Sequence, residues 1–210
     1  DNVYALNPDG TKKWEFDADD DVLTAPAIGA DGTVYAGTTG KIFALDGQTG
    51  VKKWEYTPVH DASTRGAVVG PDGTVYMSNR NRGLHALNGD TGALKWTYGF
   101  AGGADAYPAI GADGTIYIGS YDNKFYALDP SNGNVKWQYT TGGDILSSAA
   151  IAADGTIYFQ SADHNFYALT SSSMGLARGP WPKFGQNNRN THRADLYTGL
   201  VAWYPIRGNA

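Results

Sequence analysis

Residues 44–56 read ALDGQTGVKKWEY, and close copies of this stretch occur elsewhere in the chain. Residues 86–98 read ALNGDTGALKWTY, residues 127–139 read ALDPSNGNVKWQY, and a shorter form, ALNPDGTKKWEF, occupies residues 5–16. The tripeptide Asp-Gly-Thr also recurs, beginning at positions 31, 72, 113 and 154, with 41 residues from each copy to the next. A period of roughly 20 to 50 residues indicates a repeat architecture.

Each repeat divides into four short segments in which apolar and polar residues alternate, and Gly, Asn and Asp separate the segments. Alternation with a period of two is typical of a β-strand, and the separating residues are typical of tight turns. In the third repeat we expect strands at residues 107–110, 115–118, 124–128 and 135–139. Four antiparallel strands in one such repeat match one blade of a β-propeller. The sequence therefore predicts an all-β protein, a propeller of four-stranded antiparallel blades, with about five blades.

The two ends of the chain leave the closure of the ring open. The chain starts in the third strand of a first unit, whose first two strands are not in the sequence. Either the C-terminal region completes a five-blade ring, with residues 201–206 as a closing strand, or, as we favour, N-terminal repeats of a larger parent protein are absent and the chain is a fragment of a modular surface protein. A third interpretation is self-association, because the edge strand at residues 1–6 could pair with another chain. We assign the propeller to residues 1–194 and treat residues 195–210 as a tail.

Tryptophan stands at a fixed place near the end of the repeat. A lone four-stranded sheet leaves apolar residues on both faces, so it needs neighbouring sheets packed against it. We expect the large indole rings to supply that contact between blades. The tryptophans to which we assign a structural role are Trp14, Trp54, Trp96, Trp137 and Trp181.

The spacing Ala-x-Asp-x-x-Thr-Gly-x-x-x-Trp in residues 44–54 resembles the tryptophan-docking motif of pyrroloquinoline-quinone-like (PQQ-like) repeat propellers. Residues 86–96 have Asn88 in the Asp position, and residues 127–137 have Asn132 in the Thr position. The resemblance implies that each indole packs on a peptide plane of the adjacent blade. Residues 179–188 also resemble the Trp-Pro-x-Phe segment at the boundary of such domains, and residues 199–210 resemble the first strand of a laminin-G or concanavalin-like domain.

Composition excludes several classes of function. The net charge is −5, and lysines are dispersed, whereas affinity for nucleic acid depends on clustered Lys and Arg. We expect no nucleic-acid partner, and no apolar run is long enough for a membrane span. The chain has no cysteine, so disulfides and thiolate metal sites are absent. Because the first residue is Asp, we interpret the chain as mature or trimmed, and we expect an extracellular, cell-surface or periplasmic location.

The turns on one side of the expected ring are constant, and those on the other side vary between repeats. Turn residues that stay constant indicate that the backbone conformation of the turn requires them. Turn residues that vary indicate the face of the ring on which binding residues can differ from repeat to repeat. Aspartates precede the first strands on the variable face, at Asp21, Asp61, Asp105 and Asp144. Converging carboxylates suit a hard cation, so a Ca²⁺ site is one hypothesis. The alternative, which we favour, is that these are solvated loop residues.

A second candidate site on the variable face is basic and aromatic, and it would bind a protein or a glycan. Its members are Arg65, Arg80, Arg82 and Tyr121. His164, beside Asp163 in a variable loop, is a further candidate for partner binding. The alternative for the arginines is ordinary surface charge. His85 lies within a strand, and we expect it to be packed or exposed on the blade and not catalytic.

The motifs of common enzyme classes are absent, including the nucleophile elbow, the zinc-protease helix motif and the phosphate-binding loop. The family that the repeats resemble includes dehydrogenases that hold the quinone PQQ and calcium at the ring axis. Those enzymes use adjacent cysteines and an eight-blade ring, which this chain lacks, so we expect no PQQ cofactor. The interpretation we favour is a non-enzymatic scaffold that binds other molecules. Alternatives are a carbohydrate-binding module, a structural subunit of a surface assembly and, least favoured, a quinone-dependent dehydrogenase.

Overall fold

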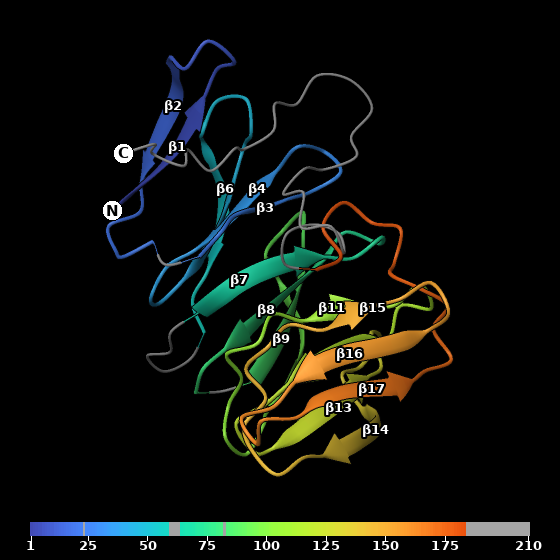
Figure 1. Ribbon diagram of the computed structural model, residues 1–210. Coiled ribbons are helices and arrows are strands. Elements are labelled where there is room, and N and C mark those ends of the chain that lie inside the picture. Colours follow the sequence, from blue (N-terminus) through green and yellow to red (C-terminus); the bar gives the residue numbers. More distant parts are fainter. Residues whose placement is uncertain (23, 59–63, 82, 184–210) are drawn as a thin grey trace, which may run out of the picture.

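The structure is a computed structural model that describes residues 1–22, 24–58, 64–81 and 83–183 of the chain. Every helix or strand in this part is a β-strand, and the strands form five antiparallel sheets. The sheets follow one another in chain order, and we call them blades I to V. In Figure 1 they lie along an arc that runs from β1 and β2, in blue, to the orange strands of blade V.

Three blades have four strands, and the first and last have fewer. Blade I contains β1 (Asn2–Leu6) and β2 (Lys12–Asp17). Blade II contains β3 (Ala27–Ile28), β4 (Val34–Gly37), β5 (Ile42–Leu45) and β6 (Lys52–Tyr56). Blade III contains β7 (Thr64–Val69), β8 (Thr74–Asn79), β9 (Gly83–Asn88) and β10 (Leu94–Tyr98). Blade IV contains β11 (Ala109–Ile110), β12 (Ile116–Gly119), β13 (Lys124–Leu128) and β14 (Val135–Thr140). Blade V contains β15 (Ala150–Ile151), β16 (Thr156–Gln160) and β17 (Phe166–Thr170).

The predicted fold class is confirmed. In the third repeat β13 has the predicted bounds, and the other three strands differ from the prediction by one or two residues. The apolar core is divided into four clusters, and each cluster lies mainly between two consecutive blades. The blades therefore stabilise one another by face-to-face packing, as expected for a sheet that is apolar on both faces.

Strand register explains why tyrosine, alanine and tryptophan recur together in each repeat. In blade II, Ala44 is opposite Tyr35 on one side and opposite Trp54 on the other. Because alanine is small, the two rings meet across β5, with centroids 5.7 Å apart. The same row exists in blades III and IV, where the ring centroids are 5.8 Å apart in both cases.

Three tryptophans bind the turn between the last two strands of the next blade. The indole Nε1 of Trp14 donates to the carbonyl of Gly47 at 3.0 Å, and that of Trp54 to Gly89 at 2.8 Å. Trp96 donates in the same way to Pro130, at 2.9 Å. A Cβ atom at Gly50, which has a φ of +73°, would lie 2.8 Å from the ring of Trp14. Glycine is thus needed for both the backbone conformation and the close approach of the indole.

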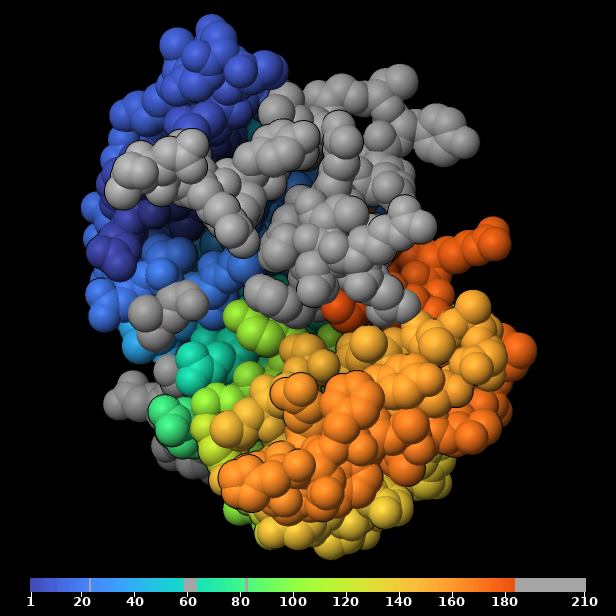
Figure 2. Space-filling view, viewed as in Figure 1, coloured from blue at the N-terminus to red at the C-terminus, as the bar shows by residue number. Residues whose placement is uncertain are grey.

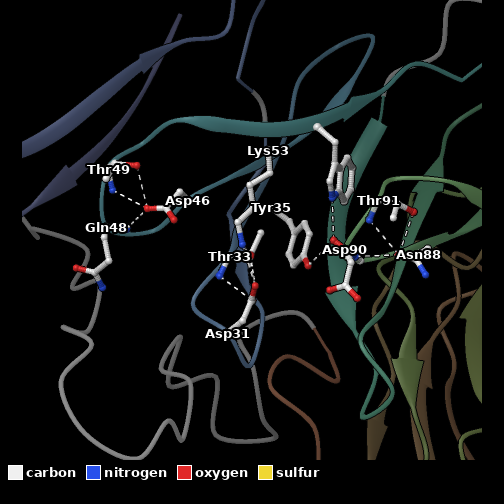
Figure 3. Close-up of polar contacts among 12 residues, drawn as sticks. Asp31, Thr33, Tyr35, Asp46, Gln48, Thr49, Lys53, Asn88, Asp90 and Thr91 are labelled. Carbon is white, nitrogen blue, oxygen red and sulfur yellow. Dashed lines mark hydrogen bonds and ion pairs between the residues drawn. The ribbon is translucent and has the colours of Figure 1, made fainter.

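In blades II, III and IV the lysine that precedes tryptophan binds the Asp-Gly-Thr turn of its own blade, whereas in blade I it donates to the turn after β5 in blade II. The Asp31 carboxylate accepts hydrogen bonds from Thr33 and lies 2.9 Å from Nζ of Lys53, as Figure 3 shows. Lys53 also donates to Oγ1 of Thr33 at 2.6 Å. Burial alone would raise the pKa of Asp31, but these hydrogen bonds lower it to about 2. The constant face is therefore held by a repeated polar contact.

After blade V the chain returns to the free edges of two earlier blades. Backbone bridges join Trp181 to Val69 in β7, and Leu176 and Lys183 to residues 109–111 at β11. Trp181 is 4% exposed and belongs to the cluster between blades II and III. The alternative closing strand at residues 201–206, the proposed tail domain at 195–210 and the rest of the Trp-Pro-x-Phe segment lie outside the described residues.

Candidate functional site

Backbone hydrogen bonds join the variable loop that leads into a blade to the variable loop between the second and third strands of that blade. The amide of Thr39 donates to the carbonyl of Asp21 at 3.1 Å, and the amide of Ala162 donates to Asp144 at 2.8 Å. The corresponding bond in blade IV runs from the amide of Tyr121 to the carbonyl of Gly103, in the loop that leads into this blade, at 3.2 Å. The loops before the first strand and between the second and third strands therefore lie on one face, as predicted.

Four side chains meet where the variable loops of blades III and IV adjoin. Nε of Arg65 lies 2.7 Å from Oδ1 of Asp105, and Nε of Arg80 lies 3.8 Å from Oδ2. The hydroxyl of Tyr121 donates to Oδ2 of Asp105, and the guanidinium of Arg80 lies over the Tyr121 ring, 5.7 Å from its centroid. We call Arg65, Arg80, Asp105 and Tyr121 the Asp105 cluster.

The backbone brings these four residues together from distant positions. Arg65 is in β7, Arg80 follows β8, Asp105 precedes β11 and Tyr121 follows β12. Gly103 makes the approach possible, because it has a φ of +78° and a Cβ atom there would overlap the carbonyl of Arg80. The geometry therefore depends on a glycine two residues before the central carboxylate.

The charges of the cluster leave one cation in excess. Burial alone would raise the pKa of Asp105, but hydrogen bonds from Arg65 and Tyr121 outweigh it and lower the pKa. The Asp105 and Arg65 side chains are 17% and 24% exposed, whereas the Arg80 side chain is 54% exposed. Arg65 thus neutralises the carboxylate, and Arg80 presents its guanidinium to solvent on the face of a tyrosine ring.

The aspartates of the calcium hypothesis have different surroundings. Asp105 pairs with arginine, and Asp21 and Asp144 each use a backbone carbonyl to bind the next blade. The backbone carbonyls of Asp21 and Asp144 accept the same loop-to-loop hydrogen bond as the carbonyl of Gly103. In blade IV the position equivalent to these aspartates is therefore Gly103, and Asp105 lies two residues after it. Asp61 lies outside the described residues. Among the described residues, no three His, Asp or Glu side chains lie close enough together to hold a metal ion.

The structure places the predicted partner-binding residues in two separate parts of the molecule. Arg65, Arg80 and Tyr121 lie together in the Asp105 cluster, and Arg82 is outside the described residues. His164 is in the turn before β17, with a φ of +69°, and belongs to blade V.

Sequence reasoning missed two carboxylates that hold loops together. Asp20, and not its neighbour Asp21, accepts a hydrogen bond from the amide of Gly40 at 3.1 Å. Asp163 accepts from the amide of Gly142 at 2.8 Å and from the hydroxyl of Tyr167 at 2.6 Å. The Gly-Gly pair at 142–143, like the pair at 102–103, is a sequence signal that loops approach closely here.

Four-stranded antiparallel blades packed side by side along an arc define a β-propeller. The chain belongs to the PQQ_2 family, whose model is described as outer membrane protein assembly factor BamB and matches residues 1–63 and 57–173. It is 38% identical over 97 residues to the serine/threonine-protein kinase AfsK of Streptomyces griseus, covering 42% of this chain and 12% of the kinase. It is 30% identical over 118 residues to a quinoprotein ethanol dehydrogenase of Pseudomonas putida, covering 50% of this chain and 18% of that enzyme.

Solved structures share the fold at low sequence identity. BamB from Moraxella catarrhalis has a TM-score of 0.68 and 22% identity, covering 76% of this chain and 53% of BamB. The computationally designed protein Ika4 has a TM-score of 0.62 and 12% identity, covering 73% of this chain and 93% of Ika4. No helix among the described residues is long and apolar enough to cross a membrane.

Proposed function

We propose that this propeller is a non-enzymatic module of the cell envelope or the extracellular space, and that it binds a protein through its variable face. The observation that carries the proposal is the Asp105 cluster, which presents Arg80 on a tyrosine ring at the junction of two blades. The description of the family as an outer membrane protein assembly factor supports a protein partner and an envelope location.

The chemistry of Arg80 favours an acidic segment of a partner protein. A guanidinium matches a carboxylate with two parallel hydrogen bonds, and arginine and tyrosine are enriched among the residues that dominate binding energy at interfaces. Stacking on Tyr121 restricts the Arg80 side chain before binding, which reduces the entropy lost on association. Arg65 holds Asp105 in place, and this carboxylate in turn orients the hydroxyl of Tyr121.

A matched pair of peptides tests this function. A fluorescein-labelled peptide with a central Glu-Ser-Glu is expected to bind, and the peptide with Gln in place of both Glu is expected to bind more weakly. Arg80→Ala should weaken the first peptide about tenfold or more, since tenfold corresponds to about 1.4 kcal/mol. Fluorescence anisotropy measures the dissociation constants. Equal affinity of the two peptides, or no effect of Arg80→Ala, contradicts the proposal.

The control variant is Lys52→Ala, which removes another exposed cation but from blade II. It should leave peptide affinity unchanged, so that a general loss of positive charge is separated from loss of the site. Two further measurements address the other functions. Binding on a glycan array with retained affinity in Arg80→Ala would favour carbohydrate recognition. Alcohol oxidation after addition of PQQ and Ca²⁺ would establish an enzyme instead.

A further inference from the structure

Two Asn-Gly pairs occur in the sequence, Asn88-Gly89 and Asn132-Gly133. Each lies at the turn between the last two strands of a four-stranded blade, the first in blade III and the second in blade IV. Figure 2 shows the teal and green residues of blade III between the blue residues of blades I and II and the orange residues of blade V. Asparagine followed by glycine is prone to deamidation, because glycine has no side chain that hinders attack by its backbone nitrogen. The two pairs can therefore be compared within one chain.

Deamidation replaces the side-chain amide of asparagine by a carboxylate in two steps. The backbone nitrogen of the glycine, after losing its proton, attacks Cγ of the asparagine and closes a succinimide ring, and the side-chain nitrogen takes up a proton and leaves as ammonia. Water then opens the ring. Attack of water at Cγ gives aspartate, and attack at the backbone carbonyl carbon gives isoaspartate. Negative charge develops on Oδ1 in the first step, so hydrogen-bond donors aimed at this oxygen accelerate the reaction.

The side-chain oxygen of Asn88 already accepts hydrogen bonds from three donors. The backbone amides of Asp90 and Thr91 each donate to Oδ1 at 3.0 Å, and the hydroxyl of Thr91 donates at 3.1 Å, as Figure 3 shows. These donors are fixed in place before the reaction starts, at the atom on which charge develops. They polarise Cγ again when water opens the ring, and this favours aspartate over isoaspartate.

The backbone nitrogen of Gly89 is free to attack. Among the described residues its amide makes no hydrogen bond. Its carbonyl is held by Nε1 of Trp54 at 2.8 Å and by the hydroxyl of Tyr35 at 3.2 Å. The carbonyl of Asn88, in the same peptide unit as this nitrogen, accepts from the amide of Gly92 at 2.8 Å. That bond stabilises the negative charge that remains when the nitrogen loses its proton.

The second pair has the opposite arrangement. The amide of Gly133 donates to the carbonyl of Asp129 at 2.9 Å, so the nucleophile is engaged. The side-chain oxygen of Asn132 accepts one hydrogen bond, from the amide of Asn134 at 2.8 Å. Asn132 is nevertheless exposed, whereas Asn88 is half-buried. Exposure alone would therefore predict faster reaction at Asn132, and the hydrogen bonds predict faster reaction at Asn88.

The turn of blade III also fits the product, because aspartate holds the equivalent place in blade II. There Oδ1 of Asp46 accepts from the amide of Gln48 at 2.9 Å, from the amide of Thr49 at 2.8 Å and from the Thr49 hydroxyl at 2.9 Å. Such bonds are stronger to a carboxylate than to an amide oxygen, and they lower the pKa of Asp46. An aspartate at position 88 would stay ionised in the same way. An ionised carboxylate is a poor electrophile, so the reaction ends there.

We propose that Asn88 is a site of spontaneous deamidation with aspartate as the main product, and that the fold protects Asn132. The reaction consumes one water molecule, releases one ammonia molecule and adds one negative charge to the turn. It gives blade III the turn residue that blades II and IV have in Asp46 and Asp129. The inference goes beyond the proposed function and does not depend on it.

The experiment incubates the full chain at pH 8 and 37 °C and follows both pairs by peptide mapping with mass spectrometry. Trypsin separates them into the peptides 83–95 and 125–136. In the folded chain Asn88 should react about tenfold faster than Asn132, as expected for preorganised donors at the developing charge. In urea the two rates should be similar, because both sequences are Asn-Gly. Equal or faster reaction of Asn132 in the folded chain, or isoaspartate as the main product at position 88, would overturn the proposal.

Variants separate the turn from the sequence pair. Thr91→Val keeps the shape of the side chain and removes one donor to Oδ1, so the rate at Asn88 should fall about tenfold. The matched control Thr49→Val, which makes the same change in blade II, should leave that rate unchanged. Circular dichroism checks that both variants are folded. An unchanged rate in folded Thr91→Val, or an Asn88→Asp chain that fails to fold, would contradict the role assigned to this turn.

Discussion

Replacing Trp54 with alanine is expected to lower the free energy of unfolding by about 3–5 kcal/mol, the usual cost of truncating a buried tryptophan. The indole is 8% exposed, packs against Tyr35 and donates to the carbonyl of Gly89 in the next blade. The substitution leaves a cavity between blades II and III and removes a hydrogen bond that joins them. Urea titration followed by circular dichroism measures the loss.

Trp137 provides the matched control in the same position of another blade. It packs against Tyr117, but it is only half-buried, and among the described residues its Nε1 donates to no turn of blade V. Trp137→Ala should therefore cost clearly less than Trp54→Ala. Equal losses would show that the hydrogen bond to the adjacent blade and the burial of the indole contribute little.

Acidification from pH 7 to pH 4 is expected to destabilise the protein through His85. Burial lowers the pKa of His85 to about 4, whereas an unfolded histidine has a pKa of about 6.5. The unfolded chain therefore binds a proton more readily, so the stability contribution is complete above pH 6.5 and is lost as pH falls towards 4. The difference corresponds to about 3 kcal/mol at full protonation.

The environment of His85 explains this shift and suggests the variant to compare. His85 is 6% exposed, its Nδ1 lies 3.2 Å from the hydroxyl of Tyr56, and its Nε2 is buried with no hydrogen-bond partner among the described residues. The equivalent places in other blades hold Phe43, Tyr126 and Tyr167. His85→Phe should therefore fold and should flatten the pH dependence of unfolding between pH 7 and 5, where carboxylates remain ionised. An unchanged slope would assign the effect to other groups.

The parts of the fold that local patterns specify could be predicted from the sequence. Turn residues and alternation define each strand within its own repeat, which is why the strand at 124–128 was located correctly. The docking of tryptophan on the next blade came from the resemblance to PQQ-like repeats. The role of the lysine beside the tryptophan could not be predicted from the sequence. Lys53 lies on the last strand of blade II, and its partner Asp31 lies in the first turn on the other side of the blade.

The site could be predicted only in part. The sequence predicts one basic and aromatic group that includes Arg65, Arg80 and Tyr121, and the structure brings these three together. Asp105 is predicted to belong with the other aspartates, because each precedes a first strand. Its role depends on a contact with a residue 40 positions away in another blade, and variable loops carry no periodic signal for such a pairing. The return of residues 175–183 to β7 and β11 was missed for the same reason, since this stretch has no alternation typical of a strand.

This returning stretch alters how the molecule can acquire its structure. In an array of repeats each unit contacts only its neighbours, so folding can spread stepwise from any point. Here Trp181 completes the cluster between blades II and III, although more than a hundred residues separate it from β7 in the chain. During synthesis on the ribosome the middle of the arc therefore cannot reach its final packing until Lys183 has emerged. Contacts between residues so far apart in the chain slow folding, because the loop between them must close before the contacts can form.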